Sequence, residues 1–254
     1  MLFRSGRSIV DRDGHQQVEQ RISSWTDSRG VTRFSTNRVI QIASGLNYLE
    51  KGEWIPAVPS FEVVGDLFIA RQGAHKLILD SNLSSPVVVD LMGPDGSRIQ
   101  ARPAMLGVHD RSTGERARLS LSQKSHGILV ETNIVLYPDA FVEISADLRG
   151  VYSRAGFEWD VILREALPDI SDLPFARMND KDMEIEVWTE FIETPATVAH
   201  RIQIDDLRSD DDIRIGEWSF ALGRGFRLDD PTGHAQGESV GIRKHIDRKS
   251  TRLN

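Results

Sequence analysis

The sequence predicts an all-β protein, folded as a large antiparallel β-sandwich or as two stacked sandwiches. Most of the chain alternates apolar and polar residues with a period of two, in short runs that end at turn residues. About ten such runs follow one another, which is typical of sandwich folds. No stretch carries an apolar stripe of helical period over three turns, so the pattern favours strands throughout.

The runs are expected to pair as hairpins, because turn residues separate them. Pro94-Asp95-Gly96 is one such turn, since proline presets a backbone dihedral and glycine tolerates a positive φ. Gln72-Gly73 and Ser125-His126-Gly127 lie within two other pairs. The predicted pairs are residues 67–70 with 76–79, 87–92 with 98–101, and 116–123 with 128–136.

A hairpin over residues 146–163 and a strand over residues 183–191 are predicted to have one face toward the core. In each, every second residue is apolar or small, as expected for a sheet that buries one face. The core faces of the hairpin are Ala146, Leu148, Gly150 and Tyr152, and then Phe157, Trp159, Val161 and Leu163. The later strand has the core face Met183, Ile185, Val187 and Phe191 and the outer face Glu184, Glu186, Trp188 and Glu190.

Four segments are expected along the chain. Residues 1–33 are sparse in apolar side chains and are predicted to be a poorly patterned, mobile or edge segment. Residues 34–204 form the main β-sandwich region, and residues 205–228 an acidic loop with a possible further strand. Residues 229–254 lack aromatic side chains and are predicted to be a poorly packed tail, whose last six residues resemble translated adapter sequence.

Composition excludes several classes of function. The 254-residue chain has a formal net charge of −7, which argues against a nucleic-acid partner. It has no cysteine, so disulfides, zinc–thiolate sites and cysteine nucleophiles are impossible. No apolar run is long enough for a membrane span or for an N-terminal signal peptide, so membrane insertion is not expected. Phosphate-loop, metalloprotease, nucleophile-elbow and dinucleotide motifs are also absent from the sequence.

Several blocks between about residues 30 and 195 resemble the front β-rich region of large, uncharacterised bacterial proteins that are exported and multidomain. The resemblance implies an extracellular or cell-surface location, with other domains of the same long chain as partners. It implies no activity, because none is established for that family. The blocks are Thr36-Asn37-Arg38, Gly45-Leu46-Asn47-Tyr48, Gly52-Glu53-Trp54, Ala70-Arg71-Gln72-Gly73-Ala74-His75, Pro94-Asp95-Gly96, Tyr137-Pro138-Asp139-Ala140-Phe141, residues 155–163 and Thr189-Glu190-Phe191.

Glu158 and Asp160 are the best candidates for catalysis. They share one face of a predicted strand, which separates their carboxylates by roughly 7 Å. That separation falls within the range of glycosidase acid and base pairs. An ordinary polar face, with Arg149 or Arg164 as an ion-pair partner, is the preferred interpretation, because glycosidase carboxylates usually come from different strands.

Trp188 among Glu184, Glu186 and Glu190 forms a candidate glycan-binding platform. An indole can stack on the apolar face of a sugar while carboxylates accept hydrogen bonds from its hydroxyls. Packing of Trp188 beneath a loop or a second sheet is the alternative, and the pattern favours it.

The acidic stretch offers a weak candidate for calcium, a hard cation that prefers carboxylate ligands. Asp210 and Asp212 are the candidate ligands, together with Asp205, Asp206 and Asp211. The spacing does not match an EF-hand loop, so a solvated acidic loop without a cofactor is the preferred interpretation.

These observations favour a non-catalytic β-sandwich module of a large extracellular or cell-surface bacterial protein, structural or adhesive, with possible glycan contact. The first alternative is a carbohydrate-active domain of glycoside-hydrolase type that uses paired carboxylates. A further alternative is an assembly module that pairs its β-edges with the rest of its own chain.

Overall fold

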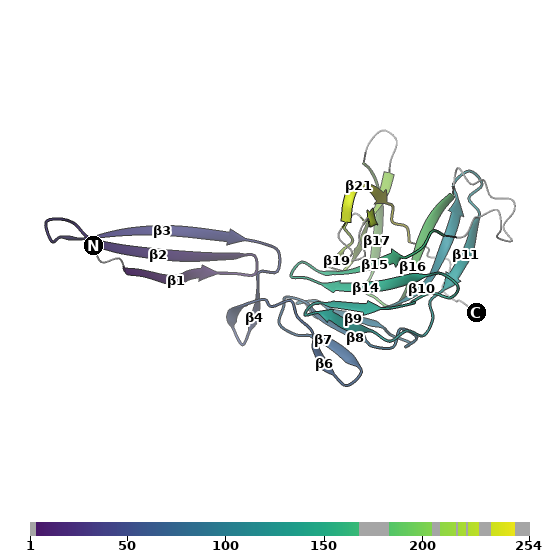
Figure 1. The fold of residues 1–254 in the computed structure, drawn as a ribbon, viewed down its shortest axis with the longest axis horizontal. Coiled ribbons are helices and arrows are strands. Elements are labelled where there is room, and N and C mark those ends of the chain that lie inside the picture. The colour runs from purple at the N-terminus through teal and green to yellow at the C-terminus, as the bar shows by residue number, and fades with distance from the viewer. Residues whose placement is uncertain are drawn as a thin grey trace. The chain divides into compact units, whose positions relative to one another are not determined.

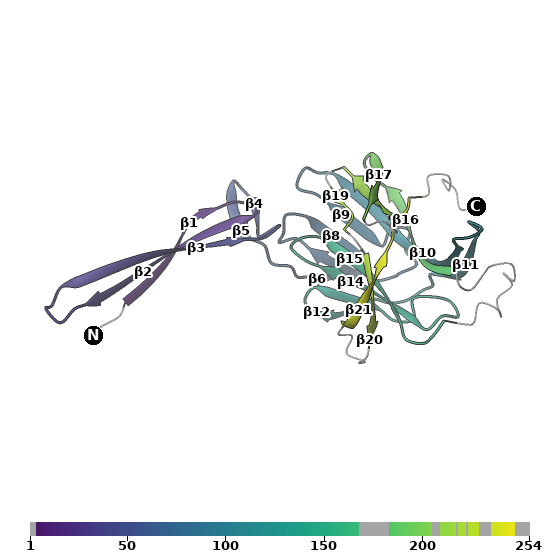
Figure 2. The ribbon, with the colours of Figure 1, turned by 90° about the horizontal axis from the view of Figure 1, so that it is seen from above.

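The computed structural model describes residues 4–167, 183–204, 209–216, 218–221, 223–228 and 235–246. Within these ranges every regular element is a β-strand, and the strand pairs whose register is defined are antiparallel (Figures 1 and 2). The predicted all-β class is therefore confirmed. The chain divides into two compact units, residues 1–94 with 99–192 and residues 95–98 with 193–254.

The first unit begins with a three-stranded sheet of β1 (Arg4–Arg12), β2 (Gln16–Thr26) and β3 (Thr32–Ile42), with β2 in the centre. Aspartates build both turns: Asp13 accepts hydrogen bonds from the backbone of His15 and Gln16, and Asp27 from Arg29 and Val31. Residues 1–33 are thus not a separate unpatterned segment, since position 33 lies within β3. The apolar pattern missed this sheet because most of its residues are polar or exposed and its strands join through backbone pairing.

The hairpin of β4 (Asn47–Glu50) and β5 (Glu53–Pro56) follows this sheet. The buried Asn47 amide donates to the carbonyl oxygens of Asp13, at 2.6 Å, and Gln16, at 3.1 Å. Gly45 has a φ of +60°, and a Cβ there would lie 2.0 Å from the carbonyl oxygen of Arg154. Glycine is therefore required at position 45 by both its conformation and its neighbour.

A seven-stranded sheet forms the centre of the first unit, and β16 joins it by pairing with β10. The predicted pairing of residues 67–70 with 76–79 is confirmed as β7 with β8, and the turn at 94–96 connects neighbouring strands β9 and β10. The strands are β6 (Glu62–Val64), β7 (Leu67–Ala70), β8 (Lys76–Asp80), β9 (Val89–Met92), β10 (Arg98–Asp110), β11 (Arg116–Leu121) and β16 (Met183–Glu193).

A four-stranded sheet contains β12 (Ile128–Glu131), β13 (Ile134–Tyr137), β14 (Ala146–Tyr152) and β15 (Phe157–Leu163) in sequence order. The predicted pairing of residues 116–123 with 128–136 is wrong. β11 pairs with β10 instead, and the run over 128–136 folds on itself as β12 and β13. The turn between these two strands is held by Asn133, whose amide donates to the carbonyl of Tyr152 at 2.8 Å.

Two buried tyrosines join a face of this sheet to the seven-stranded sheet. The Tyr137 hydroxyl donates to the carbonyl of Asp80 at 2.6 Å, and the Tyr152 hydroxyl donates to the carbonyl of His75 at 2.7 Å. Burial raises the pKa of the Tyr152 hydroxyl to about 12, so it remains a donor at neutral pH. Most of the large, fully buried side chains belong to this first unit.

Among the described residues, the second unit contains two further groups of strands after β16. The sheet of β17 (Thr197–Gln203), β18 (Ser209–Ile215) and β19 (Trp218–Ser219) has β18 in its centre. Residues 209–212 therefore lie in a strand and not in an acidic loop. The pair of β20 (Gly223–Leu228) and β21 (Ala235–Ile242) extends regular structure into the region expected to be a poorly packed tail.

Candidate ligand-binding surface

The predicted platform on β16 faces the opposite way from the sequence-based expectation. Ile185 and Val187 are 52% and 53% exposed, whereas Glu186 and Trp188 are half-buried. The prediction of a buried apolar face and a solvated acidic face on β16 is therefore wrong. The physical reason is that basic side chains from the region of β10 and β11 face the acidic side of β16, so ion pairs take the place of apolar packing.

Each of the three predicted platform glutamates faces an arginine. The Arg102 Nε donates to Glu190 Oε2 at 2.7 Å, a contact between residues 88 apart in the sequence. All of these side chains are partly exposed, so each pair stabilises the fold by about 0–1 kcal/mol. The other two pairs are Arg116 with Glu186, at 3.0 Å, and Arg111 with Glu184, at 3.7 Å.

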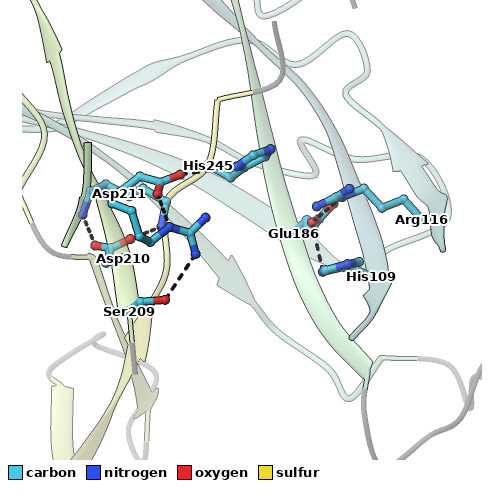
Figure 3. A network of polar contacts seen from close by, with 9 residues as sticks. His109, Arg116, Glu186, Ser209, Asp210, Asp211 and His245 are labelled. Carbon is cyan, nitrogen blue, oxygen red and sulfur yellow. Dashed lines mark hydrogen bonds and ion pairs between the residues drawn. The ribbon is translucent and has the colours of Figure 1, made fainter. Parts of the chain in front are cut away.

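Glu186 is the centre of a small polar cluster on this surface (Figure 3). Its Oε1 accepts a hydrogen bond from Arg116 and lies 3.7 Å from the Nδ1 of His109. Its Oε2 accepts a 2.9 Å hydrogen bond from the Trp188 indole nitrogen. A Cβ at Gly107 would lie 3.2 Å from that nitrogen, so glycine leaves the room that the indole occupies. The cluster thus presents an aromatic ring beside a carboxylate with fixed orientation.

The basic partners of this surface were not predicted from the sequence. Arg116 and Glu186 are 70 residues apart, and they meet only because β16 pairs with β10 beside β11. Alternation shows that Arg116 lies on a strand, but nothing in a single sequence shows which strand lies beside it.

The candidate catalytic pair is placed on β15. Asp160 lies opposite Arg149 on β14 and accepts hydrogen bonds from its Nε at 3.0 Å and its Nη2 at 2.9 Å. Glu158 is exposed on the same face, opposite Val151. The structure therefore joins Asp160 to Arg149, as the preferred interpretation expected for an ordinary polar face.

The candidate calcium ligands of the second unit lie on β18 and face cations of the chain itself (Figure 3). The buried Asp210 forms an ion pair with the Lys244 ammonium and accepts a 2.6 Å hydrogen bond from the Lys244 backbone. Burial alone would raise the pKa of Asp210, but the hydrogen bonds from Lys244 outweigh it and the pKa is lowered. Asp212 pairs with Arg214 at 3.2 Å.

Asp211 completes this arrangement by facing Arg201 at 2.7 Å and the His245 ring at 3.4 Å. Within the part of the chain that the structure describes, no three histidine or acidic side chains are grouped so that they could hold a metal ion. Asp205 and Asp206 lie outside the described residues. Calcium binding stays a prediction.

Comparisons with protein-family models, with curated proteins and with solved structures give no match to this chain. The resemblance to exported multidomain bacterial proteins therefore stays a prediction. No helix among the described residues is long and apolar enough to cross a membrane.

Proposed function

We propose that this chain is a non-catalytic β-structured module of a large extracellular or cell-surface bacterial protein. Its role is structural or adhesive, its partners are other domains of the same long chain, and its candidate glycan contact is the surface around Trp188. One observation carries the proposal. With the exception of Glu158, each candidate site carboxylate on β15 and β16 forms an ion pair with an arginine.

This pairing supports binding rather than acid–base chemistry. A glycosidase needs one carboxyl group that donates a proton to the leaving oxygen and a second carboxylate that faces the sugar. Asp160 has one oxygen that already accepts two hydrogen bonds from Arg149, and Glu186 accepts from both Arg116 and Trp188. Carboxylates that are held in place by such hydrogen bonds are suited to a contact surface, where donors and acceptors keep a fixed orientation.

The glycan contact is supported by the indole of Trp188 and its charged neighbours. Trp188 is half-buried, and its nitrogen is already bonded to Glu186, so the ring orientation is set before a ligand arrives. A preorganised aromatic side chain loses little conformational freedom on binding. The adjacent arginines and carboxylates supply both donors and acceptors for sugar hydroxyls.

The experiment is a binding screen of the full chain against a polysaccharide panel, paired with a reducing-sugar assay on the same panel. The expected result is binding to at least one polysaccharide without release of sugar. Trp188→Ala is expected to abolish this binding, whereas Trp54→Ala, a 39% exposed indole on β5, should leave it unchanged. Circular dichroism of both variants verifies folding, and Trp188→Phe keeps an aromatic ring if alanine disrupts β16.

Binding that survives Trp188→Ala would remove the glycan contact from this surface. Sugar release that disappears in Glu158→Gln or Asp160→Asn would replace the binding module with a carbohydrate-active enzyme.

A further inference from the structure

We infer that the glycan bound around Trp188 is acidic and that one of its carboxylates pairs with Arg118. This inference rests on the proposed function and names the class of sugar. Arg118 lies on β11 directly opposite Gly107 of β10, so the two residues share one face of the sheet. Trp188 reaches the same place from β16, because its indole nitrogen lies 3.2 Å from the position that a Cβ at Gly107 would take. Arg118 and Trp188 therefore flank one glycine from the two strands that pair with β10 (Figure 1).

Arg118 differs from the other arginines of this surface in its charge balance. Its side chain is exposed, and within the part of the chain that the structure describes no acidic side chain pairs with it. The other three arginines each face one of the three platform glutamates. The described residues thus leave one guanidinium beside the indole open to a ligand. A guanidinium binds a carboxylate through two parallel hydrogen bonds, so a carboxylate is a matching partner.

The spacing of the strands suits a single sugar ring. Arg118 and Trp188 stand on strands that are two strand spacings apart, which is roughly 10 Å between their backbones. Gly107 has no side chain that could stand between them. When the half-buried indole of Trp188 stacks on the apolar face of a sugar ring, a carboxylate on that ring lies toward β11, within reach of the long side chain of Arg118.

An acidic sugar fits this surface better than another polyanion does. The chain has a net charge of −7, so it does not attract polyanions as a whole. A nucleic-acid surface needs several basic side chains that follow the phosphate backbone. Here three of the four arginines are already paired with glutamates, which leaves one positive charge for one carboxylate.

The test compares short oligosaccharides of galacturonate, mannuronate and glucuronate with the methyl ester of each, by isothermal titration calorimetry on the full chain. Esterification removes the charge and keeps the sugar and its linkage. At least one acid form is expected to bind at least about 10-fold more tightly than its ester, as expected for a hydrogen bond between charged groups. Arg118→Gln should remove this difference, and Trp188→Ala should abolish binding of both forms.

Arg38→Gln is the matched control, because Arg38 is also an exposed arginine on a strand but belongs to β3 of the N-terminal sheet. It should leave both affinities unchanged, and circular dichroism verifies that the variants fold. Equal affinity for acid and ester, with binding lost in Trp188→Ala, would overturn the acidic specificity and keep the proposed glycan contact. Absence of binding to every acidic and neutral sugar would overturn both.

Salt dependence provides a readout that needs no variant. Because salt screens an exposed pair of charges, the affinity for the acid form should fall between low and physiological ionic strength, whereas the affinity for the ester should stay constant. The same change for both forms would contradict the inference. An oligonucleotide that binds more tightly than every uronate oligosaccharide, and loses its binding in Arg118→Gln, would replace the acidic glycan with a nucleic acid.

Discussion

The Tyr152 hydroxyl donates a 2.7 Å hydrogen bond to the carbonyl oxygen of His75, between residues 77 apart in the sequence. The same hydroxyl closes the space above Gly73, where a Cβ would lie 2.4 Å away. Gly73 and His75, in the block over residues 70–75 on which part of the family resemblance rested, therefore lie in the core of the first unit.

This geometry predicts an energetic coupling between Gly73 and Tyr152. Gly73→Ala should destabilise the chain because its methyl group overlaps the hydroxyl, and Tyr152→Phe should cost about 1–3 kcal/mol by leaving a buried carbonyl unpaired. In the double variant the overlap is removed, so the loss should be smaller than the sum of the single losses. Urea unfolding of all four forms measures the coupling energy.

Additive losses in that cycle would show that the two residues do not meet as described. Gly156→Ala is a control glycine substitution, because a Cβ there meets no other atom within 4 Å.

The second prediction concerns pH and His75. The ring is buried against Tyr152, with centroids 5.0 Å apart. Burial lowers the pKa of His75 below 6.5, although hydrogen bonds with the backbone of Gly156 and Ser153 act in the opposite direction. The unfolded chain therefore binds this proton more readily than the folded chain does.

The contribution of His75 to stability is then complete above pH 6.5, the ordinary value, and is lost as the pH falls through the folded pKa. Urea unfolding between pH 7.5 and pH 5 should show a falling free energy of unfolding. His75→Gln should reduce that slope, whereas His126→Gln, at an exposed position, should not. An unchanged slope in His75→Gln would mean that other groups cause the pH dependence.

The third prediction concerns the buried ion pair of Asp210 with Lys244. Lys244→Met should cost about 3–5 kcal/mol, because it leaves a buried carboxylate without its cation. Adding Asp210→Leu to Lys244→Met should recover most of the lost stability, since replacing a buried ion pair with apolar residues often leaves the free energy of unfolding unchanged. Chemical denaturation of the full chain, followed by circular dichroism, compares the three forms.

Deletion of residues 230–254 provides a separate test. Sequence patterning predicts that the deletion has little effect, whereas the contact of Lys244 with Asp210 predicts a loss of stability. A thermal midpoint unchanged within a degree or two would support the first expectation and contradict the second.

The alternation of apolar and polar residues was sufficient to predict a contact where both of its partners lie in one hairpin. The sequence alternation over residues 146–163 placed Gly150 and Trp159 on one face, and the structure pairs them directly across β14 and β15. A Cβ at Gly150 would lie 3.1 Å from the Trp159 ring, so the small residue and the large one are complementary. Asp160 pairs with Arg149, one of the two arginines that the sequence offered as partners, because Arg149 lies directly opposite it in the hairpin.

Local pattern failed where a strand meets partners far along the chain. On β16 the apolar residues Ile185 and Val187 are exposed and the glutamates face arginines, because the choice of buried face depends on what the neighbouring strands present. The N-terminal sheet was missed for a related reason: its strands are held by backbone pairing and aspartate turns, which require little apolar alternation.

The sequence alone therefore determined the all-β class, the absence of cysteine chemistry and the strand pairing of the hairpin over residues 146–163, since these depend on composition and on neighbours within about 20 residues. Tertiary structure decided which face of β16 is covered and which cation meets Asp210. Those outcomes depend on pairings between distant strands, and period-two alternation carries no information about which strand lies next to which.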